Sequence, residues 1–110
     1  MNKFEPGQLI RVSKPFEYSY KYRSAYTGAM AVTGDVFLVI GWSVADQHHP
    51  LFHTGVTYCT LLDNQGNTLL VTGSNERLRV NDAYLRYKKY PGKDEILEEL
   101  TPCVDVLSPS

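Results

Sequence analysis

The alternation of apolar and polar residues along this chain predicts a series of short β-strands. Residues 35–42 form the strongest apolar run, which is β-branched and aromatic on both faces, as in a strand at the centre of a sheet. Gly41 interrupts this run and predicts a bulge or a sharp coil. A shorter strand is predicted at residues 8–13, directly after the turn signal Pro6-Gly7.

A β-hairpin is predicted in the middle of the chain. Residues 56–62 and 68–72 favour strands, and the segment between them, 63–67, carries the glycine of a turn. Residues 76–80 alternate polar and apolar side chains, which is typical of a half-buried edge strand. Together with the two earlier runs, these segments give five strands whose spacing suits antiparallel pairing.

Three segments lie outside these strands. Residues 14–34 show no sustained period and predict a loop of about twenty residues, a length that in a small domain tends to be functional. Residues 81–92 fit a helical turn or a strand equally well, and both alternatives stay open. Residues 93–100 space their apolar side chains as a short amphipathic helix that stops before Pro102.

The order strand, long loop, strand, loop, hairpin and fifth short strand is similar to an SH3-like barrel. The resemblance covers about residues 5–80 and rests on Pro6-Gly7-Gln8-Leu9-Ile10-Arg11-Val12, on the long loop in the position of an RT loop, and on Gly34-Asp35-Val36-Phe37-Leu38-Val39-Ile40.

This resemblance implies a mainly β fold, namely a small five-stranded antiparallel SH3-like barrel with a long first loop and a short C-terminal helix. We expect a barrel domain over residues 1–92. Residues 93–110 should form a short acidic helix and tail that packs on the barrel or extends from it.

Charge is strongly segregated although the net charge is only −1. All eleven Lys and Arg residues lie outside the stretch from Ser24 to Asn75, and seven of the eight tyrosines sit beside them, at 18–26 and 84–90. Residues 94–110 carry acidic side chains and no basic ones. A chain of 110 residues fits one domain, and its near-neutral balance argues against indiscriminate polyanion binding. The two basic segments would form a local basic patch if the fold brings them together.

The first tyrosine-rich segment is a candidate contact surface. Tyr18, Tyr20 and Tyr22 alternate along the chain, so in an extended segment they would share one face, with Lys21 and Arg23 on the other. Such rings can stack on unpaired bases or anchor a protein partner, or they can simply pack as a β-ribbon over the open end of the barrel. The complete set of predicted nucleic-acid-binding or partner-binding residues is Tyr18, Tyr20, Lys21, Tyr22, Arg23, Tyr26, Arg77, Arg79, Arg86, Lys88 and Lys89.

The predicted function is that of a small non-catalytic protein that binds nucleic acid through this Tyr/Lys/Arg surface. The alternative is a protein–protein interaction module or inhibitor, such as a small viral regulatory protein, whose tyrosine-rich loop docks on an acidic partner surface. A second alternative for the basic residues after Asn75 is a solvated face that pairs with the acidic C-terminal helix.

Other functional classes find little support in the sequence. His48, His49 and His53 cluster, but adjacent side chains in an extended loop diverge and Pro50 separates them, so we expect no metal site. Cys59 lies within an apolar strand, where a thiol is usually inert, and we expect no enzyme activity, no cofactor and no small-molecule substrate. No run is long enough for a signal peptide or a membrane span, so we expect a cytoplasmic protein.

Overall fold

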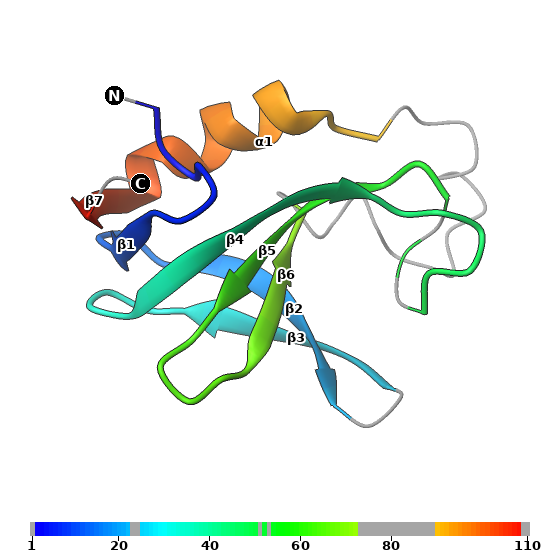
Figure 1. The fold of residues 1–110 in the computed structure, drawn as a ribbon, viewed down its shortest axis with the longest axis horizontal. Helices are drawn as coiled ribbons and strands as arrows, with labels where there is room; N and C mark the ends of the chain where they lie inside the picture. Colours follow the sequence, from blue (N-terminus) through cyan, green and yellow to red (C-terminus); the bar gives the residue numbers. More distant parts are fainter. Residues whose placement is uncertain (1, 23–24, 51, 53, 73–89, 109–110) are drawn as a thin grey trace.

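The fold is mainly β, as the sequence predicts, with a short helix near the C-terminus. The computed structural model describes residues 2–22, 25–50, 52, 54–72 and 90–108. Seven strands in this part of the chain form one antiparallel sheet (Figure 1). The elements are β1 (Leu9–Val12), β2 (Phe16–Tyr22), β3 (Ala25–Ala31), β4 (Val36–Val44), β5 (Thr57–Leu62), β6 (Thr68–Val71), the helix α1 (Lys93–Leu100), the 3₁₀ turn η3 (Thr101–Cys103) and β7 (Val104–Ser108).

Four of the five predicted strands are confirmed as β1, β4, β5 and β6. The hairpin of β5 and β6 has the expected register, with Leu61 opposite Leu69. The predicted bulge is also confirmed, because the pairing of β4 with β5 shifts register between Val39 and Gly41. The fifth predicted strand, residues 76–80, lies outside the described residues, as does most of the undecided segment 81–92.

The expected long loop at residues 14–34 is wrong, because most of that segment forms the antiparallel pair β2 and β3. Their register runs from Phe16 opposite Ala31 to Tyr22 opposite Ala25. Among the side chains of this pair that the structure describes, Phe16 and Ala31 are buried and Tyr18 is half-buried, all near the end of the pair at the core. The main-chain pairing runs along both strands, and hydrogen bonds between main-chain groups require no apolar period in the sequence.

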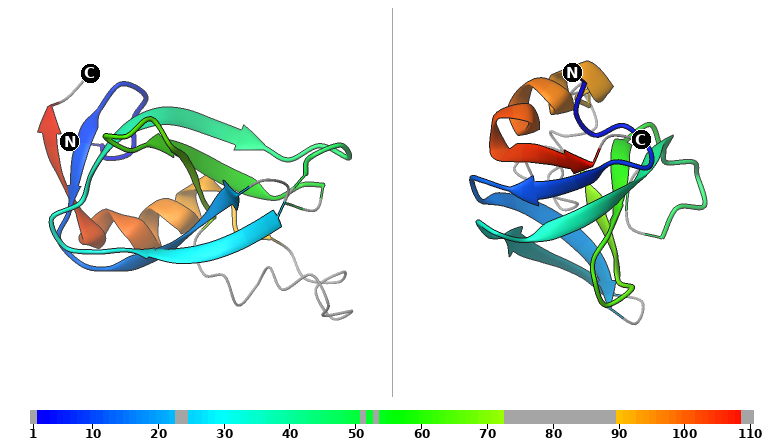
Figure 2. Two further views of the ribbon diagram at one scale, coloured as in Figure 1. Left: turned by 90° about the horizontal axis from the view of Figure 1, so that it is seen from below. Right: turned by 60° about the vertical axis from the view of Figure 1, so that its left-hand side comes forward.

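The sheet is open, which corrects the expected closure into a barrel. The strand order is β3-β2-β6-β5-β4-β1-β7, so β3 and β7 are the two edges within the described part of the chain. The strand β7, which the sequence analysis did not predict, pairs with the side of β1 that β4 leaves free. The two views in Figure 2 show the strongly curved sheet with α1 lying across it.

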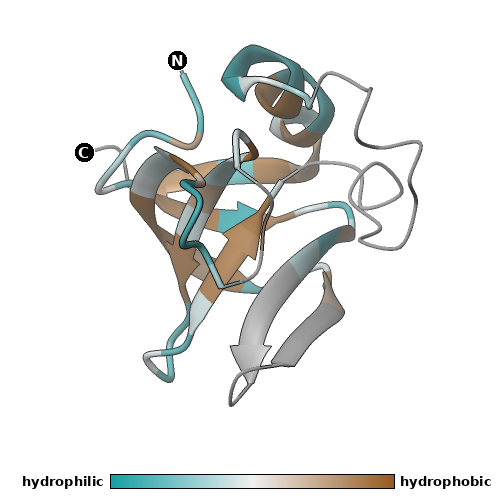
Figure 3. Cartoon of the chain, turned by 90° about the vertical axis from the view of Figure 1, so that its right-hand side faces the viewer, coloured by the Kyte–Doolittle hydropathy of each residue, from teal (hydrophilic) through white to brown (hydrophobic). Residues whose placement is uncertain are grey.

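Helix α1 confirms the predicted C-terminal helix and completes the main core. Ile96 and Leu100 are buried on its inner side, whereas Asp94 and Glu95 occupy its first turn, where acidic groups interact favourably with the helix dipole. In Figure 3 the strands of the core are coloured mainly as hydrophobic, whereas α1 carries both hydrophilic and hydrophobic residues. The main core gathers Phe4, Ile10, Val12, Phe16, Ala31, Phe37, Val39, Cys59, Leu61, Leu69, Val71, Ile96, Leu100 and Val104.

The N-terminal segment closes one end of this core. Phe4 is 1% exposed and adopts a positive φ of 60°, a conformation that costs energy for a residue with a side chain. Its carbonyl accepts a hydrogen bond of 2.9 Å from Trp42 Nε1. The buried Gln8 donates to the carbonyl of Asn2 and accepts from the amide of Glu5. These contacts hold the backbone of the segment in the conformation that inserts the Phe4 ring.

Candidate functional site

The pair of strands β2 and β3 carries all the predicted binding residues that the structure describes. Strand β2 pairs with β6 only at Ser19 and Tyr20, which lie opposite Leu70 and Leu69. Beyond Tyr20, β2 pairs with β3 alone among the described residues. The pair is here called the β2–β3 ribbon. Its distal end lies on the side of the molecule away from α1 (Figure 1).

Tyr18 sits at the base of the ribbon and has a packing role. Its ring meets Phe37 edge to face, with centroids 6.4 Å apart and an interplanar angle of 69°. The side chain is half-buried against the main core. An edge-to-face pair of this kind contributes beyond the burial of area. Tyr18 therefore fixes the ribbon to the core and is less available to a ligand than a solvated ring.

The ribbon brings four other predicted residues together along its backbone. Lys21 lies opposite Tyr26 in the ladder, and Tyr20 and Tyr22 flank Lys21 on β2. One cation and three tyrosines thus occupy neighbouring positions on two paired strands, which the sequence analysis placed in a loop. The predicted residues that lie outside the described residues are Arg23, Arg77, Arg79, Arg86, Lys88 and Lys89.

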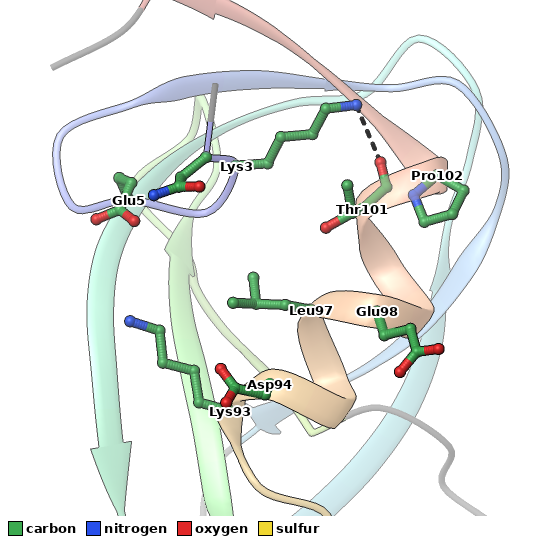
Figure 4. A pocket seen from close by; sticks show the side chains of 9 residues that line it. Lys3, Glu5, Lys93, Asp94, Leu97, Glu98, Thr101 and Pro102 are labelled. Atoms are coloured by element: carbon green, nitrogen blue, oxygen red, sulfur yellow. Dashed lines mark hydrogen bonds between the residues drawn. The ribbon is translucent and has the colours of Figure 1, made fainter.

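A surface groove that the sequence did not predict lies between the N-terminal segment and α1. The groove has a volume of about 600 Å³ and includes Leu97, with charged groups around it (Figure 4). Lys3 crosses it and donates hydrogen bonds to the carbonyls of Thr101 and Val104, at 3.0 and 2.6 Å. Lys93 lies over the ring of Trp42, with Nζ 5.5 Å from the ring centroid. Both lysines therefore have structural partners within the protein.

We expect Lys3→Met to destabilise the protein by about 1–2 kcal/mol, because hydrogen bonds from a charged donor to two carbonyls are lost while some packing of the stem is kept. The measurement is the free energy of unfolding in urea. Lys14→Met, at an exposed lysine, is the matched control and should have little effect. Equal stability of the two variants would contradict a tethering role for Lys3.

The loop between β4 and β5, here called the histidine loop, contains a small aromatic cluster; its third histidine, His53, lies outside the described residues. His49 stacks on Phe52 with centroids 5.1 Å apart and meets Tyr58 at 5.0 Å. The amide of Phe52 donates to Nδ1 of His49 at 3.1 Å, an arrangement that requires this nitrogen to be unprotonated. Burial lowers the pKa of His49 below 6.5, although Asp46 acts in the opposite direction. The described residues contain no group of three or more His, Cys, Asp or Glu side chains arranged to hold a metal ion.

This geometry predicts that acid weakens the fold through His49. Because its pKa is lower in the folded state than in the unfolded state, the unfolded chain takes up protons more readily below pH 6.5. The stabilisation is therefore complete above that pH and is lost as the pH falls through the folded-state pKa. Urea midpoints measured across this window should fall less steeply for His49→Gln than for the parent. His48→Gln, at the exposed neighbour, should keep the parental slope, and a parental slope in His49→Gln would contradict the prediction.

The buried thiol of Cys59 lacks the properties of a catalytic nucleophile. Burial raises its pKa to about 12, against a smaller opposite influence of Lys93. A thiol with this pKa carries almost no thiolate at neutral pH. Both cysteines are free.

Comparisons with known proteins do not assign this chain to a family. No known protein family, curated protein or solved structure shows significant similarity to this chain. No helix among the described residues is long and apolar enough to cross a lipid bilayer.

Proposed function

We propose that this protein is a small non-catalytic nucleic-acid-binding protein whose contact surface is the distal part of the β2–β3 ribbon. The observation that carries the proposal is the gathering of Tyr20, Lys21, Tyr22 and Tyr26 on two paired strands, where the pairing of β2 with β6 ends at Tyr20. A two-stranded ribbon fits the major groove of a duplex, and tyrosines beside cations suit the stacking of unpaired bases. A hydrogen-bonded pair of strands is also more rigid than a loop, so less conformational entropy is lost when it binds.

The direct test is fluorescence anisotropy with labelled single-stranded and duplex DNA and RNA, at about 50 and 200 mM salt. We expect micromolar binding that weakens at the higher salt by about 3.5-fold for each phosphate contact, because a lysine contact to phosphate releases counterions. Preference for single strands would assign the tyrosines to base stacking, whereas preference for duplex would assign the ribbon to a groove. Absence of binding at the lower salt would overturn the proposal.

A protein partner is the second candidate, in which the same ribbon docks on an acidic partner surface. The observation that favours it is the exposure of two apolar residues, Met30 on β3 at 48% and Val32 just after the strand at 52%. Exposed apolar side chains of this kind support protein contacts better than phosphate contacts. The two functions differ in salt response, because an interface anchored by apolar and aromatic groups changes little between the two salt concentrations.

A further inference from the structure

The two edges of the sheet differ in their protection against pairing with another strand. Strand β7 has five residues, carries the exposed Asp105, and is followed in the sequence by Pro109. Charged residues, short length and proline are the devices that keep an edge from pairing. Strand β3 has seven residues, Ala-Tyr-Thr-Gly-Ala-Met-Ala, with no charge and no proline. Among the described residues it pairs with β2 alone, so its outer main-chain groups have no strand partner in that part of the chain.

We infer that β3 is a self-association edge, on which a second copy of this chain pairs antiparallel through its own β3. The sequence of β3 favours a second copy over an unrelated strand because it is complementary to itself. A two-fold axis through Gly28 places the smallest residue on the axis, Thr27 opposite Ala29, and Ala25 opposite Ala31. The same axis sets Tyr26 opposite Met30, a pairing of ring and thioether that is favourable.

This register also satisfies the main chain. In an antiparallel sheet, the N–H and C=O groups of successive residues point alternately to the strand on one side and to the strand on the other side. The axis through Gly28 pairs odd-numbered residues with odd-numbered ones and even-numbered residues with even-numbered ones. The N–H and C=O groups that point away from β2 in one copy therefore face the corresponding groups of the other copy. No charged residue of β3 meets a like charge, because the strand carries none. The protected β7 edge prevents further growth, so the product is a closed dimer.

The pairing of a single strand buries less area than a standard interface, so we expect a dissociation constant in the micromolar range or weaker. The inference does not depend on nucleic-acid binding. Sedimentation velocity of the full chain over a wide concentration range should show a reversible monomer–dimer equilibrium. A monomer at every concentration would overturn the inference.

Position 28 allows a sharper test because it faces itself across the axis. Gly28→Lys and Gly28→Glu should each be monomeric, since each places two like charges side by side. An equimolar mixture of the two variants should form a heterodimer, since the charges are then opposite. Leu107→Lys, at an exposed residue of the β7 edge, is the matched control and should dimerise like the parent.

Two outcomes would overturn the assignment of the edge. One is dimerisation of Gly28→Lys alone at the parental strength, and the other is loss of the dimer in Leu107→Lys. Circular dichroism verifies that each variant is folded. Should the position 28 variants fail to fold, Met30→Lys at an exposed position supplies the second test. It should weaken the parental dimer at least tenfold, and unchanged association would count against β3.

Discussion

Ile96→Ala should destabilise the protein by about 2–5 kcal/mol, the range for truncation of a fully buried isoleucine. Ile96 is 0% exposed and lies on α1, where it packs into the main core with the sheet residues. Removing its side chain leaves a cavity that neighbouring β-strands, fixed by their ladders, fill only in part. Because a small domain has a total stability of about 5–15 kcal/mol, this single change should remove a large share of it.

The measurement for Ile96→Ala is the free energy of unfolding by urea, followed by circular dichroism. Ile40→Ala is the matched control because it removes the same atoms from a side chain that is 49% exposed on β4. Its effect should be well under half that of Ile96→Ala. Similar losses in both variants would show that α1 does not pack into the core as the structure indicates.

Replacing Tyr20 and Tyr22 together by alanine should weaken nucleic-acid binding on the order of 100-fold, because each base stacked on an aromatic ring is worth about 1–3 kcal/mol. Both positions lie on β2, next to the end of its pairing with β6. The strand pairing is made by the main chain, so the double variant should keep its fold. Anisotropy with single-stranded DNA measures the affinity, and circular dichroism verifies the fold.

Two lysines, one on β2 and one before it, provide a matched pair of variants for the same binding assay. Lys21 lies on the ribbon opposite Tyr26, whereas the exposed Lys14 precedes β2 near η3, with its amide bonded to the carbonyl of Cys103. Lys21→Gln should weaken binding and reduce its salt dependence, and Lys14→Gln should do neither to a comparable extent. A folded tyrosine double variant that binds as tightly as the parent would remove the ribbon from the site.

The candidate site was predictable in its residue types and less so in its geometry. The alternation of Tyr18, Tyr20 and Tyr22 is a strand signal, yet the segment favours a loop on sequence alone because no apolar period accompanies the tyrosines. The division of roles between the tyrosines was not predictable. Tyr18 packs on Phe37 because β2 reaches the core at that point, a contact between residues that are distant in the sequence.

The groove at α1 and the aromatic cluster of the histidine loop were missed for a related reason. Lys3 reaches the carbonyls of Thr101 and Val104 from the other end of the chain, and no local pattern encodes such a contact. His49 gains Tyr58 as a neighbour only after the chain has turned back into β5. Strand β7 carried a local signal, the alternation in Val104-Asp105-Val106, which the helix and Pro102 before it obscured.

The sequence by itself determined the mainly β class, the strands β1, β4, β5 and β6, the bulge at Gly41 and the C-terminal helix, because each depends on a local period or on turn chemistry. Only the tertiary structure decided the pairing of β2 with β3, the addition of β7 to β1 and the resulting open sheet. Strand pairing is a property of two segments, and its free energy comes from hydrogen bonds and burial that neither segment carries alone.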